Sequence, residues 1–354
     1  MRFFSFLLGR RGRKGFDWTD LFAYFYLALG VALILAPIGW LLVSSFKSQR
    51  ALSESDPRVL PYEQVTVPSA DGGRNLSVFE YRTPDGKMID VALLVAAGTH
   101  ATVHELGHPE NAFEVPRREL KVKEIVRPHT ENYAEPLDAS QSRTFNFTRY
   151  FMNSTVVTIA ATFLTLLINS MAAFALSKYR FRGRDFFMAM IIVTLLMPAT
   201  VILVPLFVVV RNLGMLDSLW GVIIPGAATP TGVFLLRQYM LTIPDELIEA
   251  ARMDGASEWK IYWRIILPLA LPALAVLAIL SIIWRWNDFL WPLVVLTRSE
   301  AFTLQIGLST FKGELNENTH YLLAMTVLTL LPVTAVFALL QKYITSGIAN
   351  TGMK

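Results

Sequence analysis

Long apolar stretches separated by shorter polar segments dominate this chain. Several of them reach or exceed the ~20 residues that a helix needs to cross the hydrocarbon core of a bilayer. Prolines inside these stretches predict kinked helices, because proline removes a backbone hydrogen bond. The pattern predicts an all-α polytopic membrane protein with six transmembrane helices, at Leu21–Phe46, Phe151–Leu176, Phe186–Val210, Leu219–Leu236, Ile266–Leu296 and Tyr321–Leu340.

Composition supports a membrane protein. Hydrophobic residues make up 53% of the 354 positions and charged residues only 17%, which is too apolar for an ordinary soluble domain. The chain has no cysteine, so disulfides and thiolate metal sites are excluded. The net charge of +4 arises from basic residues beside apolar stretches, where membrane topology explains them. We therefore expect a lipid bilayer and no nucleic acid among its partners.

The basic residues of the short loops predict the orientation. On one side lie Lys178, Arg180, Arg182, Arg184, Arg237, Arg252, Lys260, Arg264 and Lys342. The opposite short loops contain only Arg211, Arg298 and Lys312. Because cytoplasmic loops carry the excess of Lys and Arg, both termini are expected in the cytosol. The first span is too long for a secretory signal, so we expect it to remain uncleaved.

The segment between the first two spans is polar and about a hundred residues long, and the topology places it outside the membrane. Gln64–Val67, Leu76–Tyr81 and Met88–Val95 have strand-like patterns, and the turn signal Thr83-Pro-Asp-Gly86 joins the last two. A small β-rich extracytoplasmic insert with a hairpin is expected. The predicted domains are 1–50 with the first helix, the insert 51–148, the five-helix core 149–345 containing a cytosolic loop 237–265, and a cytosolic tail 346–354.

One motif in the insert is typical of zinc proteases. His104-Glu105-Leu-Gly-His108 has the spacing of two imidazole ligands one helical turn apart with a glutamate base between them. Gly107 inside the motif and Pro109 after it disfavour the long helix that this arrangement requires. A solvated loop is favoured over proteolysis or incidental metal binding, and we expect no metal site and no cofactor.

Two further features concern transport and energy. No glycine-rich phosphate loop followed by Lys and Ser or Thr occurs, so any ATP use must come from a partner chain. In the fifth span, Trp286, Asn287 and Asp288 form a polar group, and Arg285 could pair with Asp288 across a helical turn. The group indicates either a translocation path or an aromatic belt with an internally satisfied ion pair.

The stretch from Glu246 to Pro268 is a polar island between apolar runs. Pro244 and the acidic residues after it suit the first turn of a helix, and Leu247, Ile248 and Ala251 form an apolar stripe. Gly255 lies where a left-handed stop is expected, and Ser257 can cap a second helix. A short amphipathic cytosolic helix with a thin alanine surface is therefore predicted, onto which another protein could dock.

These residues carry a family resemblance. Glu249-Ala250-Ala251, then Gly255 after three residues, then Ile265-x-Leu267-Pro268 after nine more, resembles the E-A-A motif of permease subunits of bacterial ATP-binding-cassette importers. Phe234–Tyr239, Asp254–Ser257, Trp286–Pro292 and Thr130–Tyr133 resemble the carbohydrate branch, the maltose-type second permease. The resemblance covers the first helix and about 130–354. The stretch of about 51–127 departs from it, being longer than that family's usual outer loop.

The resemblance implies a transport subunit rather than an enzyme, importing a sugar or oligosaccharide delivered by an extracytoplasmic solute-binding protein. Its implied partners are a homologous second permease and two ATP-binding subunits. The implied coupling residues are Glu246, Glu249, Ala250, Ala251, Asp254 and Gly255. Two rivals remain: an ion-coupled secondary transporter, which would need an intramembrane relay, and a membrane-anchored zinc protease using His104, Glu105 and His108.

Overall fold

The computed structural model describes residues 18–54, 58–69, 74–138, 146–311 and 318–351. The chain divides into two compact units, Met1–His129 and Thr130–Lys354. The part of the predicted cytosolic N-terminus before residue 18 lies outside the described residues. Each unit is described by itself below.

The first unit begins with α2 (Trp18–Ser44), an apolar helix that contains Pro37. A short helix, α3 (Gln49–Ser53), follows and is capped by the Ser48 side chain, which accepts a hydrogen bond from the Ala51 N–H. The described strands after it are β1 (Tyr62–Gln64), β2 (Thr66–Pro68), β3 (Asn75–Arg82), β4 (Met88–Ala97), β5 (His100–Glu105), β6 (Ala112–Pro116), β7 (Lys121–Val122) and β8 (Glu124–Val126).

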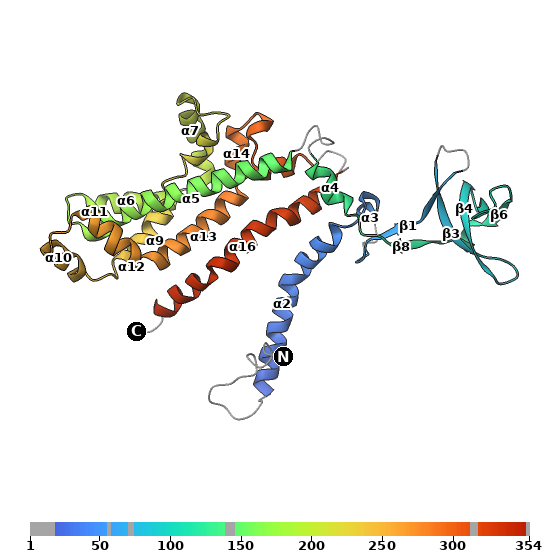
Figure 1. The fold of residues 1–354 in the computed structure, drawn as a ribbon, viewed down its shortest axis with the longest axis horizontal. Coiled ribbons are helices and arrows are strands. Elements are labelled where there is room, and N and C mark those ends of the chain that lie inside the picture. Colours follow the sequence, from blue (N-terminus) through green and yellow to red (C-terminus); the bar gives the residue numbers. More distant parts are fainter. Residues whose placement is uncertain (1–17, 55–57, 70–73, 139–145, 312–317, 352–354) are drawn as a thin grey trace. The chain divides into compact units, whose positions relative to one another are not determined.

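These strands form an antiparallel six-stranded sheet and a separate ribbon (Figure 1). The sheet order is β2-β3-β4-β5-β6, with β7 paired to β3, and the ribbon is β1-β8. The predicted hairpin is confirmed: β3 pairs with β4, and Gly86 in its turn has a left-handed φ of 82°. Buried Val91, Val103 and Val115 fill one face of the sheet, where alternate residues of neighbouring strands meet.

The second unit is helical. A 3₁₀ turn, η3 (Ser299–Ala301), and a π-helix, η2 (Tyr262–Ile266), interrupt it. Its α-helices are α4 (Glu131–Leu137), α5 (Phe147–Lys178), α6 (Arg184–Leu195), α7 (Ala199–Asn212), α8 (Leu219–Ile223), α9 (Pro230–Met240), α10 (Glu246–Met253), α11 (Glu258–Ile261), α12 (Leu267–Leu269), α13 (Leu271–Asn287), α14 (Leu290–Val295), α15 (Leu304–Ser309) and α16 (Thr319–Thr351).

Prolines shape the membrane helices more strongly than predicted. Among the described residues, three single helices (in α2, α5 and α16) are long and apolar enough to cross a membrane, or five segments if each bent pair is one span. The bent pairs are α6 with α7, at 108° beside Pro198, and α11–α12 with α13, at 76° beside Pro272. The predicted fourth span is not one helix, because α8 and α9 are separated by a link containing Pro225 and Gly226.

Helix α5 is the centre of the second unit. It packs against α9 and α13, and α13 packs in turn against α16 (Figure 1). Polar side chains join the helices where both are buried: the Thr162 and Ser281 hydroxyls lie 2.9 Å apart, and those of Ser170 and Tyr262 lie 2.7 Å apart. The Asn169 amide nitrogen donates to the Thr229 hydroxyl at 2.7 Å. Such bonds satisfy buried polar groups that would otherwise be costly in an apolar environment.

Candidate functional site

Helix α10 is held in place by Asp245, the residue directly before it. The carbonyl of Asp245 accepts hydrogen bonds from the N–H groups of Ile248 and Glu249, which begins the helix. The Asp245 carboxylate lies 2.7 Å from the ammonium of Lys178, whose side chain is only 2% exposed. Lys178 also donates to the Ile243 carbonyl at 2.5 Å. Lys178, the last residue of α5, therefore fixes the N-terminal end of α10.

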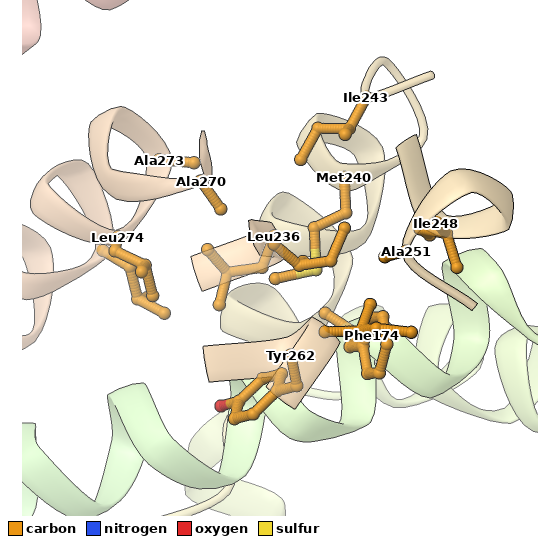
Figure 2. Packing of buried hydrophobic residues seen from close by; sticks show 14 residues of the cluster. Phe174, Leu236, Met240, Ile243, Ile248, Ala251, Tyr262, Ala270, Ala273 and Leu274 are labelled. Carbon is orange, nitrogen blue, oxygen red and sulfur yellow. The ribbon is translucent and has the colours of Figure 1, made fainter. Parts of the chain in front are cut away.

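One face of α10 is buried and the other is exposed. Ile248 and Ala251 pack into a cluster with Phe174, Met240 and other apolar residues (Figure 2). Leu247, expected in the same apolar stripe, is instead 43% exposed. Its exposed neighbours are Glu246, Glu249, Ala250, Met253 and Asp254. The side chains of Glu246, Glu249 and Asp254 make no hydrogen bond or ion pair with any other described residue.

Gly255 ends α10 through its backbone conformation. Its φ is +76°, in the left-handed region that favours glycine, while a Cβ atom there would meet nothing within 4 Å. The Gly255 N–H donates to the Arg252 carbonyl and the Ala256 N–H to the Ala251 carbonyl. The Ser257 hydroxyl then accepts from the Lys260 N–H and caps α11. The predicted stop and restart are confirmed.

A polar cluster across this turn was not found from the sequence. Arg252 Nε donates to Glu258 Oε1 at 2.8 Å, and the Tyr179 hydroxyl donates to Glu258 Oε2 at 2.5 Å. Burial, followed by the hydrogen bond to Glu258, raises the pKa of Tyr179 to about 12. The cluster joins α10, α11 and the end of α5. The long separation between Tyr179 and Glu258 hides the contact in the sequence.

The three candidate residues of the fifth span, Trp286, Asn287 and Asp288, lie in two different environments. Asn287 and Asp288 line a cavity of about 500 Å³ together with Thr165, Thr229, Ser281, Trp284 and Arg285. Trp286 is buried instead, where its indole N–H donates to the Thr329 carbonyl at 3.0 Å and its ring packs edge-on against Phe151. Trp286 is therefore a packing residue in this conformation.

The alternative of an internally satisfied ion pair in this span is not formed among the described residues. Arg285 donates to the carbonyl of Gly226 in the link between α8 and α9, and no ion pair joins it to Asp288 in the described chain. A Cβ atom at Gly226 would clash with the guanidinium, so glycine permits this contact. The buried hydroxyl of Thr165 lines the same cavity without a hydrogen-bond partner. A hydroxyl in that state can bind a polar group that enters.

The histidine motif of the insert has strand geometry. His104 and Glu105 are the last residues of β5, and His108 lies in the turn after it. His104 is buried rather than solvated, and His108 lies 3.3 Å from Glu110. Successive strand side chains point to opposite faces, so the helical arrangement of a zinc protease is not formed. Among the described residues, no group of three or more His, Asp or Glu side chains could hold a metal ion.

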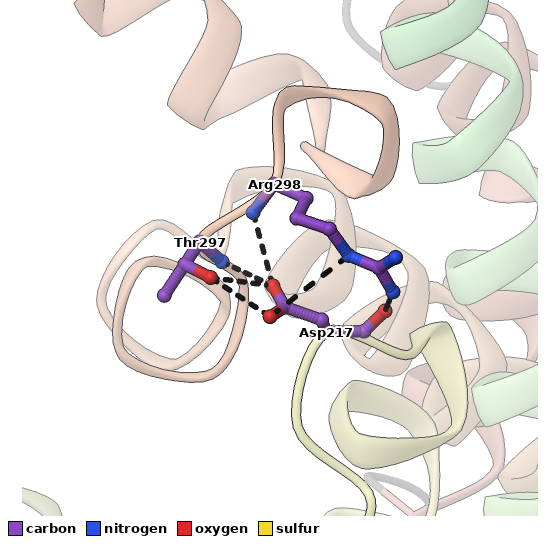
Figure 3. Close-up of polar contacts among 3 residues, drawn as sticks. All are labelled: Asp217, Thr297 and Arg298. Carbon is purple, nitrogen blue, oxygen red and sulfur yellow. Dashed lines mark hydrogen bonds and ion pairs between the residues drawn. The ribbon is translucent and has the colours of Figure 1, made fainter.

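A second polar site joins two other connections of the helical unit. Asp217 lies between α7 and α8 and has a left-handed φ of 55°. Its carboxylate accepts hydrogen bonds from the N–H and hydroxyl of Thr297 and from the N–H of Arg298 (Figure 3). These bonds lower the pKa of Asp217, with the backbone bond from Thr297 as the main cause. We call these three residues the Asp217 clasp.

The fold and the E-A-A stretch together define a helical membrane permease. Residues 166–350 match the family model described as binding-protein-dependent transport system inner membrane component. The chain belongs to this family.

Named relatives agree with that assignment. The chain is 40% identical over 205 residues to the arabinooligosaccharides transport system permease protein AraQ of Halalkalibacterium halodurans, covering 58% of this chain and 74% of the relative. It is 35% identical over 201 residues to the sn-glycerol-3-phosphate transport system permease protein UgpE of Yersinia enterocolitica, covering 56% and 72%.

A solved structure shares the fold over nearly the whole chain. It is a bacterial ABC transporter involved in the import of the acidic polysaccharide alginate, with a TM-score of 0.66 at 24% identity. The match covers 94% of this chain and 99% of that chain. The β-rich first unit and the helical second unit therefore both fall within a known architecture.

Proposed function

We propose that this chain is the membrane-spanning subunit of an ATP-driven importer for a sugar or oligosaccharide. The observation that carries the proposal is α10, a short helix whose buried face is fixed in the unit while its carboxylates face outward. The similarity to AraQ, named for arabinooligosaccharides, supports a carbohydrate substrate. Since the chain has no phosphate loop, ATP is hydrolysed by separate subunits.

The partners proposed are a homologous second permease, two ATP-binding subunits and an extracytoplasmic solute-binding protein. The proposed six-span topology would place both termini on the cytosolic side of a bacterial inner membrane, with the tail 346–354 close to the ATP-binding subunits. The loop charges support this orientation, while the described helices account for up to five of the six spans. The β-rich insert would then lie on the side from which the binding protein delivers substrate.

Coupling would proceed through the exposed face of α10. Glu246, Glu249 and Asp254 offer charges, and Ala250 and Gly255 allow close approach of a partner's groove. When the ATP-binding subunits close, α10 would move as a rigid body with α5 and α9, to which the buried cluster and Lys178 attach it. The permease halves would then change from inward-open to outward-open.

The polar cavity beside α13 is proposed as part of the translocation path. Asn287, Asp288 and the unpaired Thr165 hydroxyl can exchange hydrogen bonds with sugar hydroxyls. Trp284 is half exposed and offers an indole face on the same cavity. Tight binding is unnecessary for this role, because a transported solute must also leave.

The coupling proposal is tested by Glu249→Lys and Gly255→Asp in the assembled importer. Both variants should insert in the membrane but lose uptake and bind the ATP-binding subunits more weakly. Asp185→Lys, a charge reversal at the exposed start of α6, is the control and should transport normally. Uptake of labelled arabinotriose and co-purification of the ATP-binding subunits are measured. Normal transport by both variants would refute the assignment, and uptake abolished by an uncoupler alone would favour ion coupling.

A further inference from the structure

The ribbon β1-β8 exposes apolar side chains at the base of the insert. Tyr62 pairs with Val126 in register, so the two side chains share one face, which continues with the polar pair Gln64 and Glu124. Val126 is 51% exposed and Val59, just before the ribbon, is 64% exposed; Leu60 and Tyr62 are exposed too. A two-stranded ribbon is only marginally stable in water by itself. The ribbon would therefore be stabilised by a surface that covers its exposed apolar end at Tyr62 and Val126.

The ribbon is tied to the end of the membrane helix α2. The His129 N–H, three residues after Val126, donates to the Phe46 carbonyl at 2.9 Å. On the other strand's side, the Lys47 ammonium donates to the Arg58 carbonyl at 2.5 Å. Both anchors lie within the first unit, and Phe46 and Lys47 lie two and three residues after α2 ends at Ser44.

These short tethers limit how far the ribbon can lie from the bilayer. Three extended residues span at most about 10 Å, so Val126 lies within about that distance of the His129–Phe46 contact. A bilayer of ~40–45 Å with a hydrocarbon core of ~30 Å leaves roughly 5–8 Å for each headgroup layer. Since Phe46 lies two residues beyond the end of the apolar helix α2, the exposed side chains of the ribbon lie close to the membrane surface on the side where α2 ends.

Side chains around the anchor have the pairing typical of a membrane interface. The Lys47 ammonium lies 4.2 Å from the centre of the Trp40 ring on α2. The Arg58 guanidinium carbon lies 5.7 Å from the centre of the Tyr62 ring on the ribbon. Trp and Tyr concentrate at the headgroup level of a membrane. The Arg58 side chain is 46% exposed and can extend its charge to water or phosphate, whereas the buried Lys47 ammonium is bound within the chain.

We propose that the ribbon is a membrane contact, in which Val59, Leu60, Tyr62 and Val126 enter the headgroup layer of the phospholipid leaflet at the end of α2. The contact holds the base of the insert against the membrane surface. It does not depend on the coupling role of α10 or on the identity of the transported solute. A protein partner covering the same face is the competing occupant.

The absence of cysteine allows a direct test. A nitroxide is attached at Val126→Cys in the otherwise native importer complex in phospholipid vesicles. Collisions of the nitroxide with oxygen, which concentrates in lipid, and with a water-soluble nickel chelate are measured. Val95→Cys is the matched control, because Val95 is 60% exposed on β4 of the same unit. Tyr62→Cys provides a second label on the ribbon face, in case one variant assembles poorly.

The expected result is an oxygen-to-nickel collision ratio several-fold higher at positions 62 and 126 than at position 95. Equal ratios at all three positions would show that the ribbon lies in water and would overturn the proposal. Protection of positions 62 and 126 from both reagents would show that protein covers the face, and this too would overturn it.

Discussion

Two regions of the helical unit, the exposed face of α10 and the Asp217 clasp, differ in whether their carboxylates are hydrogen-bonded within the chain. The Asp217 carboxylate is satisfied within the chain, by hydrogen-bond donors from Thr297 and Arg298. The carboxylates of Glu246 and Glu249 face outward and make no such bond among the described residues. A connection whose polar groups bind one another serves to hold the fold. A fixed helix with outward charges is suited to contact another chain.

The largest effect on stability is expected at the buried face of α10. Ile248→Ala removes a side chain that is 3% exposed and should lower the free energy of unfolding by ~2–5 kcal/mol. Leu247→Ala is the neighbouring control and should change stability by less than about 0.5 kcal/mol. Thermal unfolding of the purified chain measures both. If Leu247→Ala nevertheless lowers uptake, the exposed face has a role outside the fold; equal destabilisation by both would contradict the two-faced helix.

At the clasp, Asp217→Ala should destabilise the unit while leaving coupling to ATP intact. It removes both side-chain acceptor oxygens and also places alanine at a left-handed φ. Asp217→Asn keeps a residue that tolerates this conformation and retains one acceptor oxygen, so its melting temperature should fall less. The number of solute molecules imported per ATP hydrolysed should stay normal in both variants. An altered ratio would remove the functional distinction between the two regions.

The clasp also has a predicted pH dependence. Because the folded-state pKa of Asp217 is lowered, its stabilising contribution is complete above the ordinary aspartate pKa of about 3.9 and disappears as pH falls through the lower folded value. The difference in melting temperature between the native chain and Asp217→Asn should therefore be constant from neutral pH down to about pH 5 and shrink in more acid solution. A difference that grows on acidification would exclude this ionised acceptor.

The smallest effect is expected at the Arg252–Glu258 contact. Both side chains are more than 40% exposed, and exposed ion pairs contribute roughly 0–1 kcal/mol. Glu258→Gln should therefore cost less than about 1 kcal/mol, while Tyr179 loses a charged acceptor. Titration of the Tyr179 absorbance should show a lower pKa in the variant. An unchanged titration would mean that burial alone controls this phenol.

Local signals predicted α10 well, whereas distant contacts could not be predicted. Proline, acidic residues and Gly255 act on their immediate neighbours, so the start and stop of α10 follow from the sequence. The partner of Arg285 is Gly226, far away along the chain, while the nearer Asp288 is the only candidate that local spacing suggests. Strand β5 could not be predicted for a related reason. The spacing of its histidines is that of a helical motif, whereas the strand is stabilised by pairing with β4 and β6 on both sides.

Lys178 has a mechanical consequence. Its ion pair with Asp245 joins the N-terminal end of α10 to the C-terminal end of α5, a helix of 32 residues and therefore about 48 Å long. Near the other end of α5, the Ser154 hydroxyl accepts a hydrogen bond from the Leu304 N–H. If α5 tilts as a rigid body about Lys178, a tilt of a few degrees moves its other end, and the residues bonded to it, by several ångströms. A displacement of α10 would thus be transmitted by the tilt of α5 to the other side of the membrane, without any helix changing its length.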